Sequence, residues 1–270
     1  MKTIVFASQK GGSGKTTVAA HMAVQAGLAG FGPVAMIDTD PQGSLYEWWK
    51  MRGEDTPTLI RSNADDLAEN LESLRSQGFR LVIVDTQPAV TEAISEVVRH
   101  ADLVAIPCRP SPHDLRAVGA TVDIVERWQK HMVFVVNSAT PRARITSEAA
   151  VALSQHGTVA PVNLHHRVDF AASMIDGRTV MEARPNGKSA EEVVALWDYF
   201  ESRMGRIQHI PMPYETAQLM GAADTSFGSR NRADEPKPIG LEIEHHTAST
   251  AAGPRRPAPS FGRRFDSNAA

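Results

Sequence analysis

A stretch with three glycines, two lysines and two threonines, residues 9–17, has the residue types that bind the phosphate groups of a nucleotide. Glycines let the backbone turn tightly, so that several N–H groups point toward one anion. The apolar run 2–7 before this stretch predicts a buried strand, and the alanine-rich run 18–29 after it predicts a helix. That helix adds the partial positive charge of its N-terminus. A strand, a glycine-rich loop and a helix in this order form the context of a phosphate-binding loop. In such a loop, Lys15 is predicted to neutralise the β- and γ-phosphates and Thr16 to ligate Mg²⁺.

Aspartates follow two other predicted strands. The run 33–37 leads into the segment Asp38-Thr-Asp40-Pro-Gln-Gly, and the apolar run 79–86 carries Asp85 near its end. Ligands of an open α/β sheet bind at the carboxyl ends of its strands, so both positions suit Mg²⁺ and water chemistry. The second run has the features of a Walker B strand, and its aspartate is predicted to hold the Mg²⁺ shell through water. The alternative for the first segment is an Asp-Pro turn that caps a helix.

The elements that must position these residues alternate along the chain. Short apolar runs predict strands at 2–7, 33–37, 57–60, 79–86, 103–107, 132–137 and 158–162. Helical periodicity predicts helices at 18–29, 63–77, 91–100, 114–130, 146–155 and 190–204. A serine followed three residues later by a glutamate predicts capping boxes at 44–47 and 189–192. The adjacent Trp48 and Trp49 are not both expected to face the core; we favour partial burial of both, and the alternative is that one meets a partner.

The phosphate-binding stretch departs from the general pattern G-x-x-x-x-G-K-[ST], because Gln9 stands where a glycine is usual and Lys10 precedes the glycine pair. The order K-G-G-x-G-K-T-T is the deviant Walker A motif, and in it the chain resembles the ParA/MinD family of ATPases. The D-x-D-P-Q-G turn at 38–43 is also similar to that family. The resemblance extends over residues 2–205. It implies an α/β P-loop fold with a doubly wound, mostly parallel sheet and helices on both faces.

The resemblance implies an ATP site with Mg²⁺ as the cofactor. Lys10 would reach across a dimer interface to the nucleotide of the other subunit, Asp40 would orient the attacking water, and Asp38 would support the site. The implied catalytic residues are Lys10, Lys15 and Asp40, and the implied metal-site residues are Thr16, Asp85 and Asp38. The implied ATP-binding residues are Lys10, Gly11, Gly12, Ser13, Gly14, Lys15, Thr16, Thr17, Asn137, Pro110 and Pro112. One departure from the family is Gln87, at a position where a proline is usual. In the family this segment after Asp85 is the second switch, and the departure leaves open how the segment moves here.

Two of these assignments lie in loops after predicted strands. The turn 108–114 is similar to a P-S-P-x-D turn of many family members, and it contains Pro110 and Pro112. An asparagine just past a strand offers one donor and one acceptor, which match N7 and N6 of adenine. The family commonly has a base-contacting residue here, so Asn137 is assigned to the base. The alternative is an asparagine that serves turn geometry.

The resemblance implies a ParA-type ATPase, a weak ATP hydrolase that a partner stimulates. Such a protein forms a sandwich dimer with ATP, binds DNA non-specifically, and partitions or positions a plasmid, a chromosome region or a protein body. The expected partners are a second copy of the chain, DNA, and a ParB-like or other adaptor protein, with no membrane. The candidate DNA contacts, each of which is otherwise an ordinary surface arginine, are Arg142, Arg144, Arg167 and Arg178. The alternative functions are a nucleotide-gated adaptor and a membrane-associated positioning ATPase that does not use DNA.

The composition sets limits on this interpretation. The one cysteine, Cys108, excludes a disulfide framework and argues against an iron–sulfur electron carrier, which needs several cysteines. The net charge of −3 is spread along the chain, so a DNA-binding surface would have to be assembled in space. No apolar run approaches the roughly 18 residues of a membrane span, and the first strand leaves no room for a signal peptide. We therefore expect a cytoplasmic protein, nucleoid-associated with ATP, with an ATPase domain at 1–205 and a proline-rich disordered tail at 206–270.

Overall fold

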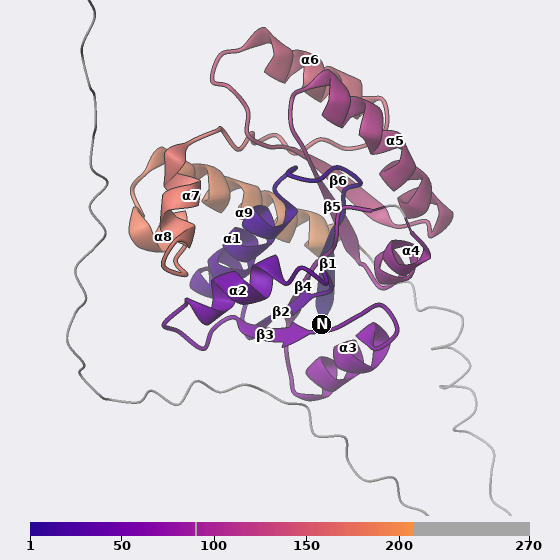
Figure 1. Cartoon of the computed structure of the whole chain (residues 1–270), viewed down its shortest axis with the longest axis vertical. Coiled ribbons are helices and arrows are strands. Elements are labelled where there is room, and N and C mark those ends of the chain that lie inside the picture. The colour runs from indigo at the N-terminus through magenta and orange to yellow at the C-terminus, as the bar shows by residue number, and fades with distance from the viewer. Residues whose placement is uncertain (90, 208–270) are drawn as a thin grey trace, which may run out of the picture.

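The computed structural model describes residues 1–89 and 91–207, so nearly all of the predicted tail lies outside the described residues and the domain boundary near 205 stays a prediction. The centre is a six-stranded sheet in which all neighbouring strands are parallel (Figure 1). The strands are β1 Lys2–Phe6, β2 Val34–Asp38, β3 Thr58–Arg61, β4 Leu81–Asp85, β5 Leu103–Cys108 and β6 His131–Val136. Their order is β3-β2-β4-β1-β5-β6, so the chain winds to both sides of β1. The predicted doubly wound α/β fold is confirmed.

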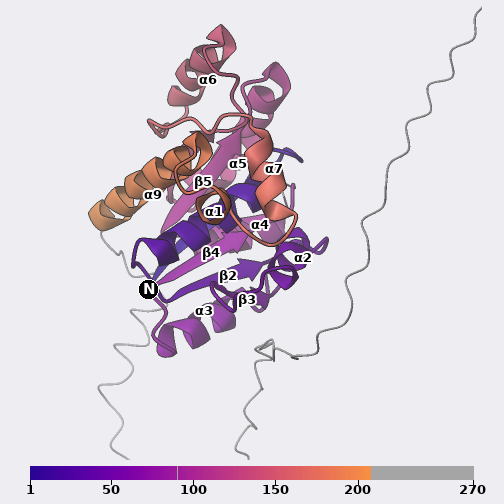
Figure 2. The same cartoon turned by 90° about the vertical axis from the view of Figure 1, so that its left-hand side faces the viewer.

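Helices cover both faces of the sheet (Figure 2). One face carries α1 Lys15–Leu28, α2 Ser44–Lys50, α7 Val168–Met174, α8 Val180–Ala183 and α9 Lys188–Arg206. The other face carries α3 Leu67–Ser76, α4 Glu92–Arg99, α5 Pro112–Arg127 and α6 Arg144–Ser154. The largest fully buried side chain of the described residues is Trp197 of α9, which makes an edge-to-face contact with Phe31 with ring centroids 5.4 Å apart. In the part of the chain that the structure describes, no helix combines the length and the apolar character needed to cross a bilayer.

Strand β1 shows why continuous apolar runs predicted the sheet. Ile4 and Phe6 lie in the core cluster beneath α1 and α9, whereas Val5 and Ala7 lie in the cluster on the other face, and all four are fully buried. Successive side chains of a strand point to opposite faces, so a parallel sheet covered on both faces needs apolar residues at every position. Polar residues are therefore confined to the strand ends, where the loops begin.

The strand predicted at 158–162 is wrong. Within the described residues this segment makes a single bridge, in which Phe134 donates to the carbonyl of Thr158 and accepts from Ala160, both at 2.8 Å. The next residue is Pro161, which has no N–H to donate and so cannot extend the ladder.

Both predicted capping boxes are also wrong. The helix α2 begins at Ser44 itself, after Gly43 with a φ of 65°, so the serine lies inside the first turn and cannot cap it. Likewise, α9 begins at Lys188 after Gly187, and the carboxylate of Glu192 binds elsewhere. A serine–glutamate spacing does not say which residue has the non-helical backbone of an N-cap. A capping box forms instead at Thr179–Glu182, at the start of α8.

The two adjacent tryptophans are both buried, at 3% and 4% exposure, contrary to the expectation that they could not both face the core. The indole N–H of Trp48 donates to the carbonyl of Arg178 at 3.3 Å, and that of Trp49 donates to the carbonyl of Pro57 at 2.8 Å. The short helix α2 is covered on two sides, by the 177–183 segment and by the segment that leads into β3, and each side takes one indole.

Candidate nucleotide-binding site

The glycine-rich loop joins β1 to α1 at the carboxyl edge of the sheet. Gly12 and Gly14 have φ values of 72° and 95°, in the left-handed region that favours glycine. A Cβ on Gly14 would collide with the side-chain amide of Asn137, which donates to the carbonyl of Ser13 at 2.7 Å. The loop thus has the compact backbone of a phosphate-binding loop, with α1 beginning directly after it.

Lys15 lies inside this loop, with 6% of its surface exposed. Its Nζ donates to the carbonyl of Ser8 at 3.2 Å. Burial lowers the pKa of Lys15, and the charges of Asp85 and Asp40 partly oppose that effect. A buried ammonium group held by one carbonyl is well placed to neutralise a phosphate, the role that the sequence predicted for it.

The structure brings Thr16 and Asp85 into direct contact. The hydroxyl of Thr16 donates to Oδ2 of Asp85 at 2.6 Å, and the aspartate is fully buried. Its other oxygen, Oδ1, has no hydrogen-bond partner among the described residues. The pKa of Asp85 is raised to about 7: burial is the largest cause, Asp38 and Asp40 also raise the pKa, and Thr16 and Lys15 lower it. A hard cation would satisfy the orphaned oxygen, so this hydroxyl–carboxylate pair fits Mg²⁺.

Asp38 organises the loop that follows β2. It pairs with Asp85 in the register of β2 and β4, and its Oδ1 accepts the N–H of Asp40 while its Oδ2 accepts the N–H of Tyr46, both at 3.0 Å. Burial raises the pKa of Asp38, and these two backbone bonds oppose the effect. Asp40 is half-buried, and its Oδ1 accepts the N–H of Gln42 at 2.9 Å. With both oxygens occupied by backbone amides, Asp38 supports the loop in this conformation; a direct role at the metal stays a prediction.

Lys10 lies on the outer side of the glycine-rich loop and is half-exposed. The loop beside it is fixed by the N–H of Gln9, which donates to the hydroxyl of Thr121 on α5 at 3.2 Å. Within residues 1–89 and 91–207, Lys10 makes no ion pair, although its charge helps to lower the pKa of Asp114. A half-exposed lysine on the rim is compatible with contact to a second subunit.

The loop after β5 contributes a residue that the sequence prediction missed. The guanidinium of Arg109 lies 3.8 Å from the point that a Cβ on Gly12 would occupy, and it donates to Oδ1 of the buried Asp114 at 3.0 Å. Pro110 lies on this loop and Pro112 opens α5, so their roles at ATP stay predictions. The signal that could have found Arg109 is its position directly after a predicted strand, at the same edge as Asp85.

The amide of Asn137 has a partner other than a base. Its Nδ2 donates to Ser13, and its backbone N–H donates to the carbonyl of Cys108 at 2.9 Å, so it connects the end of β6 to β5 and to the glycine-rich loop. The assignment to adenine stays a prediction, and in this conformation the side chain buttresses the loop.

The four arginines predicted to contact DNA lie on two separate parts of the chain, flanking α6 and α7. Arg144 pairs with Glu148 at 2.6 Å, Arg167 pairs with Glu192 at 2.6 Å, and Arg178 pairs with Asp176 at 2.7 Å. Arg142 is exposed, has a φ of 59°, and makes no ion pair within the described residues. Three of the four are therefore already paired with carboxylates, and the assignment of the four to DNA stays a prediction.

Known proteins share this sequence pattern. A family profile described as the CobQ/CobB/MinD/ParA nucleotide binding domain matches residues 4–180. The chain is 33% identical over 209 residues to the maintenance of carboxysome distribution protein A of Gloeobacter kilaueensis, covering 72% of this chain and 89% of that protein. It is 29% identical over 202 residues to the protein of the same name from Halothiobacillus neapolitanus, covering 71% of this chain and 92% of that one.

Solved structures have the same fold. A variant of McdA from Cyanothece in complex with ATP superposes with a TM-score of 0.59 at 19% identity, covering 78% of this chain and 99% of that one. The septum site-determining protein MinD of Pyrococcus horikoshii, complexed with Mg-ADP, superposes with a TM-score of 0.64 at 14% identity, covering 77% and 99%. The profile match spans well over half of the chain and includes the glycine-rich loop and both aspartate segments, and the chain belongs to the CobQ/CobB/MinD/ParA family of nucleotide-binding proteins.

Proposed function

We propose that the protein is a ParA-type positioning ATPase, which binds MgATP on the loop 9–17, dimerises in that state and hydrolyses ATP slowly. The observation that carries the proposal is the pair of Thr16 and Asp85, whose buried carboxylate has one oxygen with no hydrogen-bond partner among the described residues. The name of the relatives, maintenance of carboxysome distribution protein A, supports a positioning role and favours a protein body over a plasmid or a chromosome region as the cargo.

The chemistry follows from positioning and charge neutralisation, which dominate phosphoryl transfer. Lys15 would replace its contact to Ser8 by one to the phosphates, and Thr16 and Asp85 would hold the cation. Bound Mg²⁺ would supply positive charge next to the phosphate oxygens. Asp40, held at its backbone by Asp38, would orient the attacking water. Lys10 of one subunit would add charge at the nucleotide of the other.

DNA is the proposed track, and an adaptor protein is the proposed stimulator of hydrolysis. The phosphate contacts are assigned first to Arg142, which is exposed and free of ion pairs within the described residues, and then to Arg144. Arg167 and Arg178 would first have to leave Glu192 and Asp176. Contacts of this kind are non-specific and weaken with salt. In the cell, the ATP-bound protein would lie on the nucleoid.

The test is a gel shift and a measurement of dimer mass with ATP, with ADP and without nucleotide. Lys10→Ala is expected to abolish ATP-dependent dimerisation and DNA binding, because the variant removes the lysine that would contact the nucleotide bound to the other subunit. Asp40→Ala is expected to keep both and to lose hydrolysis. The matched control is Lys188→Ala, which removes an exposed lysine at the start of α9 and should behave as the wild type. Arg142→Ala should lower DNA affinity and reduce the salt slope by about 1.

Two results would contradict the proposal. Failure to hydrolyse ATP, with MgATP bound and under every DNA condition, would refute the ATPase. An ATP-dependent dimer that binds no DNA at low salt would refute the DNA track and favour the nucleotide-gated adaptor.

A further inference from the structure

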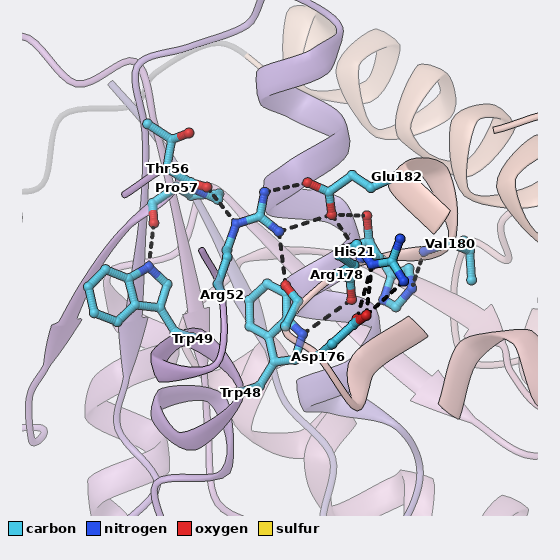
Figure 3. A network of polar contacts seen from close by, with 12 residues as sticks. His21, Trp48, Trp49, Arg52, Thr56, Pro57, Asp176, Arg178, Val180 and Glu182 are labelled. Carbon is cyan, nitrogen blue, oxygen red and sulfur yellow. Dashed lines mark hydrogen bonds and ion pairs between the residues drawn. The ribbon is translucent and has the colours of Figure 1, made fainter. Parts of the chain in front are cut away.

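A buried arginine stands at the far end of α2, away from the nucleotide site. Arg52 has 6% of its surface exposed, and its guanidinium donates four hydrogen bonds (Figure 3). Its Nε donates to the carbonyl of Thr56 at 2.7 Å, and Nη1 donates to the carbonyl of Gly177 at 3.1 Å. Nη1 donates to Oε2 of Glu182 at 2.9 Å, and Nη2 donates to Oε1 of the same carboxylate. Such a two-pronged pair fixes orientation as well as distance.

The partner carboxylate is itself fixed. Oε2 of Glu182 also accepts the backbone N–H and the hydroxyl of Thr179, both at 2.8 Å, which caps α8. Burial would raise the pKa of Glu182, but Arg52 and Thr179 outweigh it and lower the pKa. The segment 177–183 is also close-packed against the arginine, because a Cβ on Gly177 would collide with the backbone of residues 51 and 52.

The same segment is joined to the helix that carries Thr16. The backbone N–H of Val180 donates to Nε2 of His21 at 3.2 Å (Figure 3). Nδ1–H of His21 donates to the carbonyl of Thr17 at 2.7 Å. His21 lies in α1, little more than one turn after Thr16. The segment 177–183 therefore contacts α1 on one side and α2 on the other.

The helix α2 connects this segment to Asp40. It is seven residues long, or roughly 10 Å, and it begins four residues after Asp40. Its first turn is held by Asp38, which accepts the N–H of Tyr46. Its last turn is held by the indole of Trp48, and the chain two residues beyond its end is held by Arg52. A short helix fixed at both ends leaves the loop at its N-terminus little freedom to move.

We propose that the ion pair of Arg52 and Glu182 positions Asp40 for ATP hydrolysis, by fixing the far end of α2 on a segment that His21 joins to the phosphate-binding helix. The proposal rests on the proposed ATPase function and adds two positioning residues to it. A group that orients water must lie within hydrogen-bond reach, and a displacement of 1 Å can cost about a hundredfold in rate. The side chains of Lys15 and Thr16 donate to Ser8 and Asp85, neither of which lies in α2 or in the segment 177–183, so ATP binding should be unaffected when the pair is weakened.

The test uses two conservative variants of the full chain, Arg52→Lys and Glu182→Gln. The first keeps the charge and loses the planar fork, and the second keeps the shape and loses the charge. We expect kcat for ATP to fall at least tenfold in each, with the KM and the affinity for MgATP within about twofold of wild type. Matched controls are Arg75→Lys and Glu72→Gln, an exposed pair on α3 at 2.7 Å, which should leave kcat unchanged.

Hydrogen exchange of the α2 amides, with MgADP bound, reports the positioning itself. The variants should exchange faster over residues 44–50 and at the wild-type rate over α1. If Arg52→Lys does not fold, Glu182→Gln decides the matter, because its amide oxygen still caps α8.

Each other outcome overturns the assignment. Variants with wild-type kcat show that the pair is not needed for positioning. A fall in kcat together with weaker ATP binding and a lower melting temperature shows that the pair only stabilises the fold. A lower kcat with unchanged exchange over α2 shows that the effect does not pass through that helix. Absence of hydrolysis by the wild type refutes the proposed ATPase and the positioning role together, whereas normal wild-type hydrolysis with unaffected variants refutes the positioning role alone.

Discussion

His21 is a fully buried histidine held in one protonation state, and replacing it by glutamine should remove a specific pH dependence of stability. Its Nδ1–H donates to the carbonyl of Thr17, and its Nε2 accepts from Val180, so a second proton would place two donors face to face. Burial lowers the pKa of His21 from 6.5 to about 4, although the Thr17 carbonyl and Glu182 act in the opposite direction. Glutamine keeps an acceptor for Val180 and does not titrate.

The sign and the size follow from this pKa. Because the folded pKa lies below the unfolded one, the unfolded chain binds more protons between pH 4 and 6.5, and the free energy of unfolding falls as the pH is lowered through that window. Each pKa unit is worth about 1.4 kcal/mol, so His21 accounts for a loss of about 3 kcal/mol between pH 7 and 4, of which about 2 kcal/mol appears by pH 5.

The measurement is urea unfolding of the wild type and of His21→Gln at pH 7, 6, 5 and 4. Relative to His21→Gln, the free energy of unfolding of the wild type should fall by about 2 kcal/mol between pH 7 and 5 and by about 3 kcal/mol between pH 7 and 4. Taking the difference matters, because other titrating groups contribute equally to both proteins and cancel. Parallel pH profiles would refute the reasoning, since they would mean that His21 is charged in the fold or gains no proton on unfolding.

Two further predictions concern the nucleotide site itself. Gly14→Ala should lower the affinity for MgATP more than tenfold and lower the free energy of unfolding, measured by thermal unfolding, by about 1–2 kcal/mol. The reason is that φ of Gly14 is 95° and that the side chain of Asn137 occupies the space a Cβ would need. The control Gly27→Ala, in an open position of α1, should raise the free energy of unfolding by up to about 1 kcal/mol. Asp85→Asn should stabilise the metal-free protein at pH 8 by up to about 4 kcal/mol. The pKa of Asp85 is about 7 in the fold and 3.8 in the unfolded chain, so the free energy of unfolding falls as the pH rises from 4 to 7. The same variant should abolish the stabilisation by MgATP, and an unchanged melting temperature in EDTA would contradict the prediction.

The sheet was predictable because its information is local. A strand such as Leu81–Asp85 is buried on both faces, so it is written as an unbroken apolar run that ends where the loop begins. Helix starts were less predictable, because a cap depends on the backbone angle of one residue. The pattern at 44–47 fits a capping box, yet the left-handed Gly43 starts the helix directly at Ser44. The burial of Trp48 likewise depends on a partner 130 residues along the chain, Arg178, whereas Trp49 donates to the nearby Pro57.

The nucleotide site divides in the same way. Lys15 and Thr16 were predicted from a contiguous motif, and Asp85 from its place at a strand end. The structure brings Asp85 to Thr16 across 69 residues through the parallel register of β1 and β4. The position of Arg109 after a strand predicts the edge on which it lies, but no local pattern predicts that its guanidinium lies beside the glycine-rich loop or that Asn137 donates to the backbone of that loop. These contacts depend on the path that the loops after β5 and β6 take across the carboxyl edge of the sheet. The hydrophobic periodicity of the sequence does not encode that path.

The charges of the site explain why nucleotide and cation are expected to bind together. Burial raises the pKa values of Asp38 and Asp85 and lowers that of Lys15, so each group is driven toward its neutral form by its own surroundings. Phosphate alone would satisfy the lysine but would bring negative charge toward two buried carboxylates, and a cation alone would satisfy Asp85 but would repel the lysine. Only the pair of ligands offsets both costs. Under the proposed function, MgATP would therefore supply the charges that complete the folded site.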